Sequence, residues 1–157
     1  TLTIVGSQLG DEGKGALVDR WGGDADVVVR DQGGDNAGHT VVEGGVEYKL
    51  SLVPSGAVRG PTGILGNGRV VNPKTLFTDI ADLRARGLDP YVRDARRAHV
   101  TPPHHRVPAA LHEASTPDAH PGNAAATTAR GIPPTALHHA ASRALRVTNP
   151  LRRDAAR

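Results

Sequence analysis

The feature that most constrains the fold is a glycine-rich loop directly behind a short apolar segment. Residues 2–5 are apolar or β-branched and predict a short buried strand, and the glycine-rich residues 6–15 follow before a helical stretch. Glycines let backbone N–H groups approach an anion closely, and the N-terminus of the following helix adds a favourable dipole. This order of strand, loop and helix predicts an α/β fold that binds phosphate at the loop.

Charged residues inside this first loop indicate its chemistry. Lys14 supplies a positive charge for phosphate, but the loop is not a Walker A loop, because Gln8 stands where Gly and Gly15 where Ser or Thr would be needed. A carboxylate among phosphate-binding amides repels phosphate unless a metal lies between them or the carboxylate removes a proton. Asp11 is therefore a candidate Mg²⁺ ligand and general base. A tight glycine turn with solvent-facing charges is the alternative.

A second glycine-rich loop, residues 31–40, follows a second predicted strand at residues 25–30. Loops that follow neighbouring strands meet at the carboxyl edge of an α/β sheet, where such folds bind ligands. His39 then becomes a candidate donor to a transferring phosphoryl group, and Asn36 a donor to a base or phosphate. Taken alone, a histidine here would more often cap a turn or lie on the surface.

The remaining pattern alternates strands with a helix. Residues 48–53 alternate as a strand and end at Pro54, and residues 63–65 form another short apolar segment. The clearest helix covers residues 73–86, between an Asn72 N-cap and a stop at Gly87. Residues 66–68 predict a turn. The fold class expected is α/β, with a mostly parallel sheet and flanking helices.

Composition divides the chain near residue 100. Sixteen of the 19 glycines lie in residues 1–68, whereas residues 101–136 hold seven of the 12 prolines. We therefore expect a nucleotide-binding core over residues 1–100 and a partly helical, loosely packed region over residues 101–157. Residues 84–157 carry 12 Lys/Arg against five Asp/Glu, a net +7. Because residues 92–157 contain no aromatic residue for stacking, nucleic acid is not expected as a partner.

Other function classes are excluded or disfavoured. The chain has no Cys, so disulfides and thiolate chemistry are excluded. It has no long apolar run and no signal-like N-terminus, so we expect a cytoplasmic protein without membrane contact. The later histidines lack the spacing of metal ligands, and we expect most of them to be incidental surface residues.

Residues 8–15 and 32–40 resemble the two signature loops of adenylosuccinate synthetases. The resemblance continues through residues 49–56 and 65–71 and spans residues 2 to about 114. Leu9 stands where Trp is usual, and Ser51 where His is usual. The family has a P-loop-like synthetase fold, of which this chain would form an incomplete part.

The resemblance implies GTP-dependent ligation of IMP and L-aspartate by a homodimer that uses one Mg²⁺ ion. Asp11 would remove the N1 proton of IMP and, with the Gly38 carbonyl, hold the ion, while His39 would assist phosphoryl transfer. The implied GTP contacts are Gly10, Glu12, Gly13, Lys14, Gly15, Gly38, His39 and Thr40. The implied IMP contacts are Asp11, Lys14, Asn36, Ala37, Gly38, His39 and Thr128.

Residues 127–147 resemble the family's IMP phosphate segment with several replacements. Ala129 and Pro133 stand where glycines are usual, and Ser142 stands where an arginine reaches the neighbouring subunit's IMP. The family's guanine-recognition and aspartate-binding segments are not in these 157 residues. The alternative is a truncated, catalytically incompetent relative that retains only nucleotide or phosphate binding.

Overall fold

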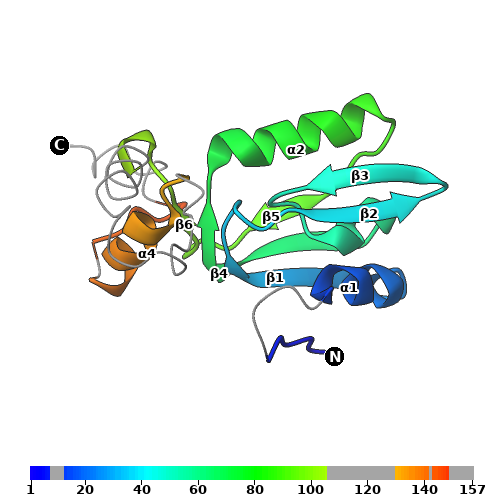
Figure 1. Cartoon of the computed structure of the whole chain (residues 1–157), viewed down its shortest axis with the longest axis horizontal. Helices are drawn as coiled ribbons and strands as arrows, with labels where there is room; N and C mark the ends of the chain where they lie inside the picture. The colour runs from blue at the N-terminus through cyan, green and yellow to red at the C-terminus, as the bar shows by residue number, and fades with distance from the viewer. Residues whose placement is uncertain (8–12, 106–129, 142, 149–157) are drawn as a thin grey trace, which may run out of the picture.

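The computed structural model describes residues 1–7, 13–105, 130–141 and 143–148 (Figure 1). The helices are α1 (Lys14–Gly22), α2 (Pro73–Ala85) and α4 (Ile132–Ala140), with short 3-10 turns at Ser55–Arg59 and Pro103–His105. The strands are β1 (Val27–Gly33), β2 (His39–Glu43), β3 (Val46–Leu50), β4 (Thr62–Val71), β5 (Val92–Asp94) and β6 (His99–Val100).

The central sheet is parallel and is built around β4. Strands β1 and β5 flank β4 in the order β1-β4-β5, and β6 pairs in parallel with the last residues of β4. Strands β2 and β3 form a separate antiparallel hairpin, whose turn uses Gly44 at φ 58° and Gly45 at φ 81°. The expected α/β class, with a mostly parallel sheet and flanking helices, is confirmed.

Helix α2 follows the predicted capping pattern. The Asn72 side chain accepts a hydrogen bond from the Lys74 backbone at 3.1 Å, and Pro73 occupies the first turn. Gly87 has φ 84°, and its N–H donates to the Arg84 carbonyl as the helix ends. The prediction of this helix is confirmed to within one residue.

The hydrophobic core lies between β4, the β2–β3 hairpin and α2. Its fully buried members include Leu52 and Leu65 at 0 % exposure, and Leu83 of α2 at 1 %. Helix α2 covers this core along one side in Figure 1, and α1 lies beside the first residues of β1. The core thus holds the hairpin, and with it the loop before β2, in a fixed position against the sheet.

The predicted strand at residues 2–5 is wrong. These residues have no regular secondary structure, and Leu2 and Val5 are 65 % and 80 % exposed. Strand propensity is realised only when a neighbouring strand pairs with the segment, and β1 pairs with β4 alone among the described residues. An apolar segment of four residues does not reveal whether such a partner exists.

Other strand boundaries also differ from the predictions. Strand β1 covers residues 27–33 rather than 25–30, and β2 begins at His39, so both ends of the predicted second loop lie in strands. Strand β3 ends at Leu50, because the N–H groups of residues 51–53 bind the Asp79 carboxylate instead of a strand. Residues 66–68 lie inside β4 and form no turn. A Cβ on Gly66 would lie 2.2 Å from Asp31 Oδ1, so these glycines allow β1 and β4 to approach closely where the register shifts.

Helix α4 packs beside β6. Gly131, at φ 77°, precedes it, and Pro133 lies in its first turn, where the helix tolerates proline. Thr135 is fully buried, and its hydroxyl lies 2.8 Å from Nδ1 of buried His105. The division of the chain near residue 100 stays a prediction. No helix in the described part of the chain combines the length and apolarity needed to cross a membrane.

Candidate active site

The start of α1 lies directly against the start of β2. Gly13, at φ 70°, precedes α1 without a side-chain cap, and Lys14 is the first helical residue. A Cβ added to Gly15 would lie 3.4 Å from Cβ of His39. The end of the first glycine-rich loop and the His39 end of the second loop therefore meet.

His39 is held by hydrogen bonds at both ring nitrogens. Its Nε2 lies 3.0 Å from the Val53 carbonyl and its Nδ1 lies 3.2 Å from an Arg30 guanidinium nitrogen. A carbonyl only accepts and a guanidinium only donates, so Nε2 carries the proton and Nδ1 is the acceptor. The ring is thereby fixed as one neutral tautomer.

The surroundings of His39 favour its uncharged form. Burial, and to a smaller degree the Arg30 charge, lower the pKa of His39 to about 4, against a partial offset from the hydrogen bond to Val53. Arg30 also donates to the carbonyls of Ser51 and Ala37 at 2.8 and 3.0 Å. One arginine thus connects the His39 ring, the second loop and the segment after β3.

Asp79 of α2 supports this arrangement and was missed by the sequence analysis. Its Oδ2 accepts hydrogen bonds from the N–H groups of Ser51, Leu52 and Val53 at 2.9, 2.7 and 3.2 Å. Asp79 is 7 % exposed, so it fixes the carbonyl that His39 contacts from inside the protein. The available signal was a carboxylate on the apolar face of α2, between Leu76 and Leu83.

Hydrogen bonds and packing also fix the buried part of the second loop, at Gly34 and Asp35. Buried Asp35 accepts hydrogen bonds from Asn72 Nδ2 and Thr75 Oγ1 at 3.1 and 2.7 Å. Its carbonyl accepts from the Arg130 guanidinium, just before α4. A Cβ on Gly34 would lie 2.6 Å from the Ile132 side chain, so α4 packs against the loop backbone. Residues 130–132 therefore border the second loop.

A buried arginine, Arg69, lies beneath the second loop. Arg69 is 0 % exposed and donates to the Gln32 carbonyl at 2.7 Å, while its Nε and second terminal nitrogen have no partner among the described residues. Burial lowers the pKa of Arg69 to about 9 and raises that of the partly buried Asp94 carboxyl. This positive charge adds to that of Arg30 beneath residues 31–33.

The remaining predicted site residues divide into two groups. Asn36, Ala37, Gly38 and Thr40 are exposed around the His39 end of the second loop. Gly10, Asp11, Glu12 and Thr128 lie outside the described residues. The structure therefore brings Gly13, Lys14 and Gly15 together with His39, while the position of Asp11 stays a prediction.

The two metal ligands that the resemblance implies, Asp11 and Gly38, would supply oxygen atoms. Among the described residues no group of three or more His, Cys, Asp or Glu side chains could hold a metal ion. Mg²⁺ takes oxygen ligands and commonly uses one or two from the protein beside phosphate oxygens and water. A carboxylate at position 11 and the Gly38 carbonyl are ligands of this kind.

Comparisons with known proteins agree with this geometry. The family model for adenylosuccinate synthetase matches residues 3–157. The chain belongs to the adenylosuccinate synthetase family. Curated relatives with that name are 59 % identical over 157 residues in Halobacterium salinarum and 42 % identical over 156 residues in an Exiguobacterium species. The chain is covered at 100 % and 98 % in these matches but spans only 35 % of each relative's length.

Solved structures show the same fold. A fully ligated adenylosuccinate synthetase from Plasmodium falciparum matches with a TM-score of 0.81 and 32 % identity, over 93 % of this chain and 34 % of that one. The succinoaminodeoxyadenylate synthetase of cyanophage S-2L, bound to dGMP and dATP, matches with a TM-score of 0.55 and 27 % identity. This second match covers 66 % of the chain and 30 % of the phage enzyme.

Proposed function

We propose that this chain supplies the two catalytic loops of an adenylosuccinate synthetase, which ligates IMP and L-aspartate through a 6-phosphoryl-IMP intermediate at the expense of GTP. The observation that carries the proposal is the contact between the Gly13–Gly15 start of α1 and His39, in a chain of this family. The proposal includes a cytoplasmic homodimer acting in AMP synthesis.

The first loop binds the phosphates of GTP. Gly13 has no side chain to cap α1, and the N-terminal end of a helix favours anions. Gly10 and Glu12 precede this turn, and Lys14 adds the positive charge. Thr40, exposed next to His39 on β2, binds the same phosphates from the other side.

Asp11 and Gly38 form the part of the site that would bind the metal ion. Asp11 removes the N1 proton of IMP, which leaves the 6-oxygen a stronger nucleophile toward the γ-phosphorus of GTP. Its carboxylate and the Gly38 carbonyl are the oxygen ligands that would hold Mg²⁺. When bound, that ion neutralises the negative charge of the phosphates.

His39 assists the transfer as a neutral donor. The 6-oxygen forms a bond to the γ-phosphorus, GDP leaves, and the Nε2–H of His39 donates to a phosphoryl oxygen. Because Nε2–H now donates to the Val53 carbonyl at 3.0 Å, the ring exchanges that acceptor for the phosphoryl oxygen. The aspartate amine then attacks carbon 6 of the purine, and phosphate departs.

IMP is held along the second loop. Asn36 and Ala37 are exposed there, and the Arg130 contact with the Asp35 carbonyl places the segment after Thr128 next to the loop. Backbone and side-chain groups from both segments can then contact one nucleotide. Positioning of two substrates supplies much of the rate enhancement in such reactions.

A chimera tests this proposal. The chain replaces the matching 157-residue segment of the Halobacterium salinarum relative, and adenylosuccinate formation is followed by ultraviolet absorbance. We expect turnover that requires IMP, GTP, L-aspartate and Mg²⁺. In the chimera, His39→Gln and Lys14→Ala each lower kcat/KM by about 10²–10³-fold, because each removes charge stabilisation of the transferring phosphoryl group.

The control variant is Arg84→Ala, which removes an exposed cation of α2 that pairs with Asp89. It leaves kcat/KM of the chimera within about twofold, since exposed pairs contribute little. A folded chimera that binds GTP but forms no adenylosuccinate, beside an active relative, would contradict the proposal. So would equal losses in Arg84→Ala and His39→Gln.

A further inference from the structure

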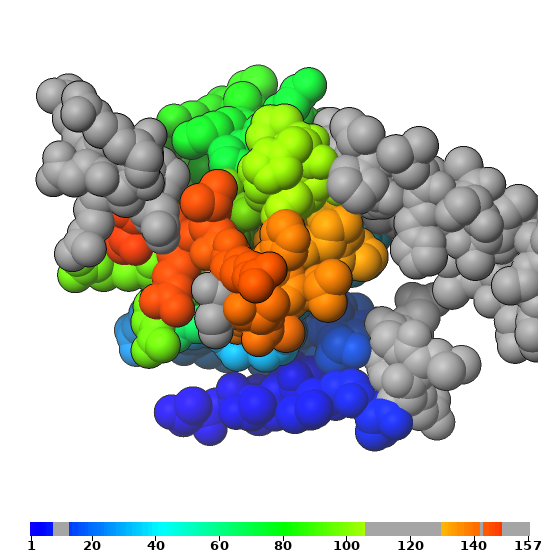
Figure 2. All heavy atoms as spheres, turned by 90° about the vertical axis from the view of Figure 1, so that its left-hand side faces the viewer, coloured from blue at the N-terminus to red at the C-terminus, as the bar shows by residue number. Residues whose placement is uncertain are grey.

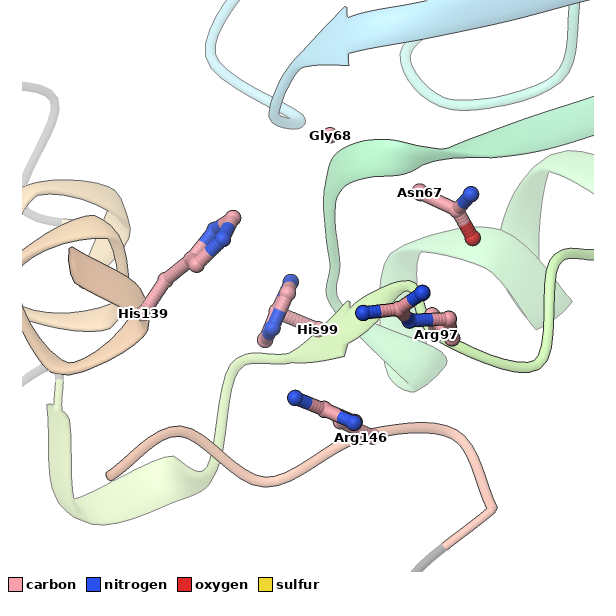
Figure 3. A pocket seen from close by; sticks show the side chains of 6 residues that line it. All are labelled: Asn67, Gly68, Arg97, His99, His139 and Arg146. Atoms are coloured by element: carbon pink, nitrogen blue, oxygen red, sulfur yellow. The ribbon is translucent and has the colours of Figure 1, made fainter. Parts of the chain in front are cut away.

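A pocket lies between the end of the sheet and α4, and His39 is not among the described residues that line it. Its volume is about 310 Å³, and its lining residues are Asn67, Gly68, Arg97, His99, His139 and Arg146. Figure 2 shows this face, on which α4 (orange) lies beside residues of the β6 region (yellow-green). Figure 3 shows both arginine side chains beside the His99 ring, with His139 approaching from α4.

The described residues that line this pocket are rich in cationic groups and include no carboxylate. Arg97 and Arg146 contribute two guanidinium cations, and His99 and His139 contribute two imidazole rings. The charged groups that act on His99 are His139 from α4, Arg97 before β6 and Arg146 after α4. All of them disfavour a proton on His99 while the pocket holds no anion.

Backbone hydrogen bonds fix the two segments that carry His99 and Arg146 against each other. Hydrogen bonds from the Val100 N–H to the Leu145 carbonyl (2.8 Å) and from the Val147 N–H to the Ala98 carbonyl (2.9 Å) flank Arg146. Residues His99 and Arg146 form an isolated antiparallel bridge between these bonds. A charge held on paired backbone loses little further freedom when it binds a ligand.

The rings of His99 and His139 stack on each other, although both lie beside arginine cations. The His99 and His139 ring centroids are 3.8 Å apart with 19° between the planes. His99 is 6 % exposed, and its Nδ1 has no hydrogen-bond partner among the described residues. A buried polar nitrogen without a partner is costly unless a bound group contacts it.

We propose that this pocket binds a phosphate group, as inorganic phosphate or as the phosphate of a small monoester, between Arg97, Arg146 and the His99–His139 pair. Two guanidinium groups and protonated imidazoles form the charge-assisted hydrogen bonds that phosphate oxygens accept. Among the described residues, none of the GTP and IMP contacts proposed above lines this pocket.

Binding in this pocket is coupled to proton uptake. Burial and the neighbouring positive groups lower the pKa of His99 in the empty pocket, and a bound anion reverses the effect of those charges. Binding therefore tightens as the pH falls and His99 gains a proton. Because α4 and residues 143–148 contribute to one side of the pocket and β4 and β6 to the other, the anion also links these segments.

The test is an NMR titration of the histidine ring protons with inorganic phosphate. It uses the full chain carrying Lys14→Ala, which weakens phosphate binding at the first loop, and His139→Gln identifies the His139 signals. We expect saturable shifts of the His99 and His139 signals and a lower Kd at pH 6 than at pH 8. Arg97→Gln and Arg146→Gln each raise this Kd by roughly tenfold.

Arg96→Gln is the matched control, because it removes the same charge one residue from Arg97 but outside the pocket lining. It leaves the Kd within about twofold. Unchanged His99 and His139 signals at saturating phosphate, or equal weakening by Arg96→Gln and Arg97→Gln, overturn the proposal.

Tighter binding of ribose 5-phosphate than of inorganic phosphate supports the same site with an ester as its ligand. Stronger binding of a short RNA duplex, weakened equally by all three arginine variants, contradicts it.

Discussion

At the residue scale, the glycine-rich motif predicted where His39 lies but not the contacts that fix its neutral form. The sequence pattern placed His39 in a loop near the first glycine-rich loop, and the structure confirms that proximity to Gly15. Its neutral tautomer depends on Arg30 and on the Val53 carbonyl, nine and 14 residues away. No local pattern predicts these two contacts, because they exist only after β1, β2 and the segment behind β3 have packed together.

The protonation of His39 predicts a pH dependence of stability. The native pKa of about 4 is below the unfolded value near 6.5, so stability is complete above pH 6.5 and falls as the pH drops toward 4. Urea denaturation should show that wild type loses about 2–3 kcal/mol more than His39→Gln across this range. The other histidines are present in both proteins, so their contributions to the pH dependence of stability cancel in the difference. Parallel pH profiles for wild type and variant would contradict the neutral, buried state of His39.

At the element scale, locally encoded features were predicted best. Helix α2 was predicted to within one residue, because Asn72, Pro73 and Gly87 act within one turn of the helix ends. The strand at residues 2–5 was wrong and β3 was predicted too long, because strands depend on partners elsewhere in the chain. The three N–H groups after β3 bind Asp79, which is 26 to 28 residues away.

Asp79 should be a strong determinant of stability. Replacing Asp79 with Ala leaves the N–H groups of residues 51–53 without their acceptor, two of them in buried hydrogen bonds. We expect a loss of about 3 kcal/mol in the free energy of unfolding, measured by urea denaturation at pH 7. Asp82→Ala, on the exposed side of α2, is the matched control and should change stability by less than about 0.5 kcal/mol. Similar effects of the two substitutions would show that Asp79 does not organise this segment.

At the scale of the whole molecule, segments far apart in sequence converge on the second loop. Residues 13–15 reach His39, α2 reaches Asp35 through Thr75, and Arg130 with Ile132 reaches the loop from the C-terminal region. The sequence predicted that two glycine-rich loops would meet, since loops after parallel strands share one edge of the sheet. It did not predict the role of α4, and it assigned the later histidines to the surface, whereas His99 and His105 are 6 % and 4 % exposed.

The most direct test of the central claim, that Asp11 and His39 share one phosphate site, is a paramagnetic NMR measurement. The chain has no Cys, so Asp11→Cys gives a single attachment point for a nitroxide label. The label should broaden the His39 and Gly38 amide signals most strongly, with the effect decreasing along β2 toward Glu43, about 13 Å away. Undiminished His39 and Gly38 signals, or broadening that increases toward Glu43, would contradict the account.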